Sequence, residues 1–305
     1  MNPEFGGDIL EQYKNTTNKV KKRFLRKPNI TEACDSFTSL AQQCESLELP
    51  VYAGLCWIAA ARCEGSLTNL TGETSCLVKS ARQFLKAEEN DFCLGCHSPS
   101  TENLQAGLNC YTHATSRYGE HSPIPIGLNL EIVDFLKRIG REEYIENYLN
   151  SAVEMSKNRP DTKAHCLELL AKSFIDNGDY VGALEVYMEI SNLLELLPKN
   201  GSRSELLLKC EVNSVFLLLI LRPSPQRLSV KCAKLLEKYT WGDHSDKSIK
   251  FCRMTEKMFL LMQSLVTICQ SLDTSHLVEL EGEFWPFLET DEKELLRILI
   301  RTYYP

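Results

Sequence analysis

Apolar residues recur three and four positions apart along most of the chain, whereas alternating runs of β-branched residues between hairpin turns are nearly absent. Spacing of three and four places apolar side chains on one face of an α-helix. The pattern therefore predicts an all-α fold. The expected helices, bounded by proline, glycine and capping residues, cover residues 8–27, 31–47, 51–64, 73–89, 102–118, 204–221, 225–239, 248–271, 274–287 and 291–304, with Thr31 as the expected N-cap of the second.

Two of these helices are unusually apolar. The segment 51–64 is apolar over most of its circumference, so we expect it to be buried between neighbouring helices. The segment 215–221 is the most apolar of the chain, but polar and charged residues precede it and Arg222-Pro223 ends it. It is too short to cross a bilayer, and it predicts a buried helix without membrane insertion.

The clearest helical hairpin lies between residues 163 and 194. Its first helix carries a large–small–aromatic series, its turn a glycine–acid–aromatic series, and its second helix a small–aromatic series. These residues are Leu167, Leu170, Ala171 and Phe174, then Gly178, Asp179 and Tyr180, then Ala183, Leu184 and Tyr187. The order is typical of tetratricopeptide hairpins, in which glycine ends the first helix and alanines let two helices approach closely.

A weaker copy of this hairpin lies upstream, with Gly140 at its turn. The two copies predict a tetratricopeptide-like stack of antiparallel helical hairpins, an α-solenoid or superhelix, with a plain helical bundle as the alternative. Residues 1–7 are expected to be a disordered cloning remnant, because Met-Asn-Pro-Glu-Phe is typical of such a remnant. Residues 8–305 are expected to form one domain with a soft break at 198–203.

The net charge and its distribution along the sequence indicate which classes of partner the protein could bind. The 305 residues carry a net charge of -7, which argues against nucleic acid as a partner. Charge is also unevenly distributed, because residues 19–27 are strongly basic and residues 279–294 strongly acidic. Each cluster can also be an ordinary solvated helix face.

The 13 cysteines are expected to be reduced thiols in the cytosol. Their number is odd, the chain is large, and no apolar N-terminal run with a cleavage site is visible. Five of them have apolar neighbours typical of a helical core, namely Cys56, Cys63, Cys166, Cys210 and Cys269.

Motifs for catalysis are absent: we find no phosphate-binding loop, dinucleotide fingerprint, nucleophile elbow or zinc-protease motif. The sequence therefore predicts a protein that is not an enzyme and has no cofactor. One constellation has zinc-ligand spacing, Cys93, Cys96, Cys110 and His113, and Cys93 to His97 also fits a haem-attachment sequence. We favour free thiols, because Cys110 and His113 lie within an expected helix, and keep a zinc-binding protein as an outside alternative.

The remaining aromatic and histidine residues give little further information. His121, His165, His244 and His276 have no acidic or nucleophilic neighbour in a recognisable pattern, so surface or capping roles are expected. Of the tryptophans Trp57, Trp241 and Trp285, we expect two in the core, although an exposed tryptophan is often a binding hot spot.

Five stretches along nearly the whole chain resemble the forty-kilodalton huntingtin-associated protein family, also called the factor VIII intron 22 protein family. They are NKVKKRFLRKPN at 18–29, DYVGAL at 179–184, CEV at 210–212, LEKYTW at 236–241 and WPFL at 285–288. The basic run is the most specific of them. The short break at 198–202, where vertebrate members carry a long proline-rich insertion, indicates an invertebrate-like member.

The resemblance implies a stack similar to that of the soluble NSF attachment proteins, and a non-catalytic scaffold that binds and stabilises huntingtin. It also implies early-endosome traffic through a Rab-family GTPase and a cytoplasmic location with early-endosome association, and it leaves room for a nuclear pool. The alternative is a vesicle-traffic adaptor of the attachment-protein type that acts on SNARE bundles.

We expect the basic and acidic clusters to meet oppositely charged surface on the partner, and exposed tryptophans to serve as anchors. The predicted partner-binding residues are Lys21, Lys22, Arg23, Arg26, Lys27, Trp241, Glu281, Glu283 and Trp285.

Overall fold

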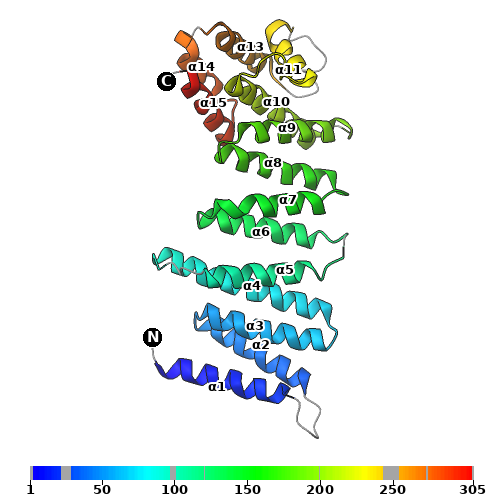
Figure 1. Ribbon diagram of the computed structural model, residues 1–305, viewed down its shortest axis with the longest axis vertical. Helices are drawn as coiled ribbons and strands as arrows, with labels where there is room; N and C mark the ends of the chain where they lie inside the picture. The colour runs from blue at the N-terminus through cyan, green and yellow to red at the C-terminus, as the bar shows by residue number, and fades with distance from the viewer. Residues whose placement is uncertain are drawn as a thin grey trace. The chain divides into compact units, whose positions relative to one another are not determined.

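Every regular element in the described part of the chain is a helix, so the all-α prediction is confirmed. The computed structural model describes residues 3–21, 29–96, 101–119, 121–198, 200–242, 254–272 and 274–303. The chain divides into two compact units, Met1–Tyr148 and Leu149–Pro305, each built from antiparallel helices joined by short connections (Figure 1). A single repeat domain over 8–305 with a soft break at 198–203 stays a prediction.

The first unit is a series of helices in which α2 to α5 each pack against the next. The elements are α1 (Pro3–Val20), α2 (Ile30–Ser46), α3 (Pro50–Ser66), α4 (Leu70–Cys93), α5 (Glu102–Thr115), α6 (Ile124–Arg138) and the 3-10 helix η1 (Glu142–Tyr144). The α3 and α4 backbones are close, because a methyl group at Gly54 would lie 2.9 Å from the Phe84 ring. The Ser80 hydroxyl donates a 2.8 Å hydrogen bond to the Gly54 carbonyl at the same crossing.

The second unit begins with the hairpin that the sequence predicts. After α7 (Ile145–Met155), which crosses the boundary between the units, come α8 (Pro160–Asp176) and α9 (Tyr180–Glu195). Gly178 takes a φ of +77° in the turn, and the Asp179 carboxylate accepts a 3.0 Å hydrogen bond from the Gly182 amide to cap α9. Ala171 and Ala183 are fully buried, so the predicted close approach of the two helices is confirmed.

The rest of the second unit is organised around α10 (Gly201–Leu221), which packs against both α9 and the last helix. The remaining elements are α11 (Val230–Trp241), α13 (Glu256–Ser271), the 3-10 helix η2 (Thr274–His276), α14 (Leu277–Phe284) and α15 (Thr290–Tyr303). Residues 215–219 of α10 are buried, as predicted for this apolar segment. No helix in the described ranges combines the length and the apolar character that crossing a bilayer requires.

Several predicted helix limits were wrong. Helix α1 begins at Pro3, before the predicted start at residue 8, because proline is well suited to the first helical turn. The N-cap of α2 is Asn29 rather than Thr31, since the Asn29 side chain accepts the Glu32 amide and donates to the Glu32 carboxylate. Helix α11 begins at Val230 with Ser229 as its cap, and the predicted start at Pro225 falls in an irregular segment.

The apolar helix α3 is buried less completely than predicted. It lies between α2 and α4, and these two neighbours cover most of its surface. Val51 and Leu55 remain exposed on the strip between them. An apolar circumference therefore predicts burial correctly only where neighbouring helices are close on all sides.

Ten of the 12 described cysteines are buried free thiols, including all five that the sequence places in the core. Burial raises the pKa of Cys56 and Cys210 to about 12 and that of Cys269 to about 11. Only Cys93 and Cys96 are exposed among the described cysteines. The thiolate is the reactive form, so burial protects Cys56, Cys210 and Cys269 twice, because it excludes reagents and keeps these thiols protonated.

We expect a maleimide to label Cys93 and Cys96 quickly in the folded protein and the ten buried cysteines slowly. Cys252 lies outside the described residues, so the test uses a variant with serine at Cys93, Cys96 and Cys252. Mass spectrometry should find almost no fast label on this variant when folded and ten labels in denaturant. Fast labelling of any further cysteine in the folded variant would contradict the described core.

Candidate functional site

The predicted basic site lies mostly outside the described residues. Lys21 is exposed and is the last described residue before the segment 22–28. Lys22, Arg23, Arg26 and Lys27 all fall within that segment. Nearby, the Lys19 ammonium pairs with the Glu32 carboxylate of α2 at 3.0 Å.

The structure corrects the prediction for the tryptophans. Only Trp57 is a core residue, with 2% of its surface exposed, whereas Trp241 is 86% and Trp285 39% exposed. Trp241 is the last residue of α11. Both exposed tryptophans belong to the predicted partner-binding residues, and their indole surface is available to a partner.

Trp285 follows directly on α14 and lies close to two cations of α15. The Lys293 ammonium is 4.8 Å and the Arg297 guanidinium 4.7 Å from the centre of its ring. The Glu281 carboxylate is 3.5 Å from the same Arg297, and Glu283 is exposed. Three predicted residues, Glu281, Glu283 and Trp285, therefore share one end of the second unit.

The acidic segment 279–294 is not wholly available to a partner. The Glu289 carboxylate pairs with Lys209 at 3.0 Å and Asp291 pairs with Lys172 at 2.6 Å. Glu292 is buried and accepts a 2.8 Å hydrogen bond from the Glu289 amide at the start of α15. The start of α15 thus uses its acidic residues inside the unit, and on α14 Glu281 pairs with Arg297 whereas Glu283 is exposed.

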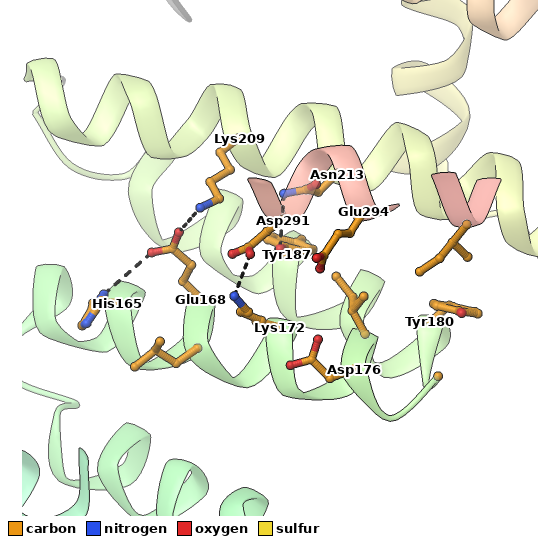
Figure 2. Close-up of a pocket in the computed structure, with 14 residues that line it drawn as sticks. His165, Glu168, Lys172, Asp176, Tyr180, Tyr187, Lys209, Asn213, Asp291 and Glu294 are labelled. Carbon is orange, nitrogen blue, oxygen red and sulfur yellow. Dashed lines mark hydrogen bonds and ion pairs between the residues drawn. The ribbon is translucent and has the colours of Figure 1, made fainter. Parts of the chain in front are cut away.

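These internal pairs border a polar pocket of about 390 Å³ among α8, the start of α9, α10 and α15 (Figure 2). Helix α8 supplies His165, Glu168, Lys172 and Asp176, which recur at helical spacing along one face. The other charged or polar groups that Figure 2 labels are Tyr180, Tyr187, Lys209, Asn213, Asp291 and Glu294.

The Glu168 carboxylate lies between two partners, 3.7 Å from the His165 ring and 2.7 Å from the Lys209 ammonium. The interaction with His165 and that with Lys209 outweigh burial and lower the pKa of Glu168 to about 2. Burial disfavours the charge of Lys209, but its hydrogen bonds to Glu168 and Glu289 prevail and raise its pKa. The pair therefore stays ionised at neutral pH and holds α8 against α10.

The pocket contains no Ser, Thr or Cys nucleophile among its described lining residues. Burial raises the pKa of Tyr187, whose hydroxyl accepts a 3.2 Å hydrogen bond from the Asn213 amide, so this phenol stays protonated. Most of the charged groups neutralise one another across the three helices. The arrangement fits a polar connection that fixes α15 on the α8–α10 pair better than it fits acid–base or nucleophilic chemistry.

Sequence reasoning missed this pocket, although two signals for it were present. Histidine and acid are three residues apart in His165–Glu168 and again in His276–Glu279, where the distance is 3.2 Å. The first helices of successive hairpins also lie side by side, so polar residues on α8 and α10 could be expected to meet. Asp291 and Glu294 of α15 line the pocket only because α15 packs against helices far away in the sequence, and no local sequence pattern predicts that packing.

We expect Glu168→Gln to destabilise the second unit by about 2 kcal/mol at neutral pH, because it leaves the Lys209 charge less compensated. The folded pKa of Glu168 is depressed, so its contribution is present above about pH 4.5 and is lost as pH falls toward about pH 2. The stability gap between wild type and variant, measured by urea unfolding, should therefore narrow below about pH 4.5.

The matched control is Glu237→Gln on the exposed face of α11, which should change stability by less than about 0.5 kcal/mol. If Glu168→Gln matched this control at neutral pH, the half-buried pair of Glu168 and Lys209 would contribute no stability.

The outside alternative of a zinc site is not supported by the positions of its four residues. Cys93 ends α4 and Cys96 follows it, both exposed, whereas Cys110 is buried with its sulfur 3.6 Å from the Ser80 hydroxyl. His113 lies on α5 with its Nε2 atom 3.9 Å from the Glu73 carboxylate. Across the described ranges, no three His, Cys, Asp or Glu side chains are grouped so as to hold a metal ion.

Comparison with known proteins places the chain in a family. No protein-family model matches it. It is similar to the 40-kDa huntingtin-associated proteins of Mus musculus and Rattus norvegicus, with 30% and 29% identity. Each alignment covers 97% of this chain and 92% of the relative, and its 355 positions exceed the 305 residues here, so the relatives have inserted residues. The chain belongs to the family of the 40-kDa huntingtin-associated proteins.

Proposed function

We propose that this protein is a non-catalytic scaffold that binds huntingtin in a tight complex and stabilises it. The observation that supports the proposal is the extent of the similarity, which covers 97% of this chain and 92% of the mouse huntingtin-associated protein. The relatives carry the name of a binding partner rather than of a reaction, which fits a scaffold.

The described surface offers suitable anchors for a large partner. Trp241 and Trp285 are exposed, and tryptophan is enriched among residues that dominate binding energy. Helical hairpins present broad rigid faces, and a partner that is itself built of helices can bury a large apolar area against them. Such an interface would make the complex stable rather than transient.

The proposal includes a cellular setting that the resemblance implies. The complex would act in the cytoplasm, associate with early endosomes and bind a Rab-family GTPase there, with a nuclear pool in addition. Proximity labelling from this chain in cells, with and without huntingtin, tests the setting. Labelling of early-endosomal proteins only when huntingtin is present would support it, and a pattern without endosomal proteins would contradict it.

The decisive experiment is co-expression of the chain with huntingtin from the same organism, followed by size-exclusion chromatography in moderate salt. One co-eluting complex that survives dilution supports the scaffold proposal. Separate elution of two folded proteins contradicts it. SNARE bundles added to the same column provide the comparison, because their co-elution in place of huntingtin would favour the attachment-protein alternative.

The basic cluster gives a prediction about kinetics. Changing Lys21, Lys22 and Arg23 to glutamate should slow association with huntingtin by about tenfold at low salt, because the cluster steers the encounter with an acidic surface. Stopped-flow association at several salt concentrations measures the effect, which should shrink as salt rises.

The matched control changes three exposed cations outside the cluster, Lys86, Lys234 and Arg301, to glutamate. It alters the net charge equally and should leave most of the association rate intact. Equal rates for the two triple variants would show that only total charge matters.

A further inference from the structure

Helix α9 has an apolar face that is buried inside the unit and a second face on which apolar and polar residues are mixed. Its buried face carries Ala183, Val186, Tyr187, Ile190 and Leu194. A second set of residues, at 181, 184, 185, 188, 189 and 192, has the spacing of a continuous helix face over three turns. This spacing is the one by which helices pack on one another.

This second face of α9 lines an open groove. The opposite wall is the end of α10, the irregular segment 222–229 and the start of α11, and the groove measures about 1160 Å³. Lys231 of α11 hydrogen-bonds Asn192 and lies 3.7 Å from Glu195, so the two walls meet near the end of α9. The α9 side of the groove is about 16 Å long, the length of three helical turns.

The floor of the groove is apolar and partly open to water. Val181 is 54% exposed, Val230 is also exposed, and Leu184 and Met188 are half-buried. Val181, Leu184 and Met188 follow one another at i, i+3 and i+7, the pattern that a partner helix with its own apolar stripe would match. Methionine adapts its shape to different neighbours, which suits a docking surface.

The two walls of the groove carry opposite charges. The α9 wall has Glu185, which is exposed, and Glu189, which pairs with Lys163 at 2.7 Å. The opposite wall has Arg222, Arg227 and Lys231, all exposed. Arg222 also lies 3.8 Å from the centre of the Tyr303 ring and Lys231 also hydrogen-bonds Asn192. A helix that lies in the groove would therefore be held in one orientation, with basic residues toward α9 and acidic residues toward the 222–231 wall.

We propose that this groove binds one amphipathic helix of huntingtin, about three turns long, with an apolar stripe, a basic flank and an acidic flank. The inference rests on the proposed function and adds to it the place and chemistry of a contact. A second copy of this chain is a poorer fit, because two α9 faces brought together would place Glu185 and Glu189 of both copies side by side. The groove also exceeds the usual volume of a small-molecule pocket, about 300–1000 Å³.

The test compares two apolar side chains of similar exposure in the same unit. Val181→Glu places a charge on the groove floor, where Val181 is 54% exposed, and Leu260→Glu places one on α13, away from the groove and from the predicted partner-binding residues, where Leu260 is 49% exposed. We expect Val181→Glu to weaken binding to full-length huntingtin by at least about tenfold, and Leu260→Glu by less than about twofold. Affinity is measured by biolayer interferometry with the full chain, and circular dichroism confirms that both variants are folded.

A photo-crosslinking amino acid at Val181 or Val230, followed by mass spectrometry of the complex, identifies the occupant. Cross-links from both positions to one huntingtin helix with the stated charge pattern support the proposal. Cross-links to a second copy of this chain overturn it, and so does Val181→Glu binding within about twofold of a wild type that binds normally. A wild type that does not bind huntingtin overturns the proposed function as well as the groove, so the two failures are distinguishable.

Discussion

Replacing Trp57 with alanine is expected to destabilise the first unit by about 3–5 kcal/mol, as large aromatic deletions in cores do. Trp57 is 2% exposed and lies on α3 between α2 and α4. Its indole nitrogen donates a 2.7 Å hydrogen bond to Glu45 of α2, and the Lys79 ammonium of α4 lies 4.4 Å from the ring centre. The change therefore removes apolar volume and one of the hydrogen bonds to the Glu45 carboxylate, which keeps the 2.9 Å bond from the Gln83 amide.

Urea unfolding followed by circular dichroism measures this effect without depending on tryptophan fluorescence. Trp241→Ala is the matched control, because the same side chain is 86% exposed at the end of α11 and its loss should change stability by less than about 0.5 kcal/mol. Equal unfolding midpoints for the two variants would contradict the assignment of Trp57 as the only core tryptophan.

Replacing Phe284 with alanine is expected to destabilise the second unit by a similar amount, about 3–5 kcal/mol. Phe284 is fully buried at the end of α14, with its ring edge-to-face against Phe216 of α10 at 6.0 Å. Helix α14 is only eight residues long and depends on few buried side chains. We expect its detachment to increase hydrogen exchange at α14 well before the rest of the unit unfolds.

Phe287→Ala provides the control for this prediction, because Phe287 is 37% exposed three residues further on. It should lower stability by less than about 1 kcal/mol and leave hydrogen exchange at α14 unchanged. If the two phenylalanine variants exchanged alike, the contact between Phe284 and Phe216 would not be what holds α14.

The fold was predictable because its signals are local. The spacing of apolar residues predicts the helices. The geometry of the α8–α9 hairpin follows from its turn residues, Gly178 and Asp179, and from its small residues, Ala171 and Ala183. The helix boundaries were predicted less accurately, because the N-cap is whichever of several neighbouring polar side chains reaches the free backbone amides of the first helical turn. At α2 Asn29 does so in place of Thr31, and at α11 Ser229 does so after an irregular segment that the sequence had suggested was helical.

The site was harder to predict because surface chemistry depends on long-range packing. A run of acidic residues at 279–294 looks uniform in the sequence, yet Glu289 and Asp291 are bound internally while Glu283 is exposed. The groove beside α9 has a similar origin. The spacing of Val181, Leu184 and Met188 was visible, but whether another helix covers that face could not be read from it.

The ten buried cysteines make the lifetime of the protein depend on how long its helices stay packed. While the helices stay packed, ten cysteines are inert toward oxidants, since burial excludes the reagent and most of these thiols have raised pKa values. When a hairpin opens, its thiols become accessible and ionise more readily, and a disulfide formed in that state would prevent the helices from closing again. Each opening of a hairpin under oxidising conditions can therefore inactivate the protein permanently. The rate at which folded protein is lost to oxidation should depend on how often single hairpins open, rather than on the free energy of complete unfolding.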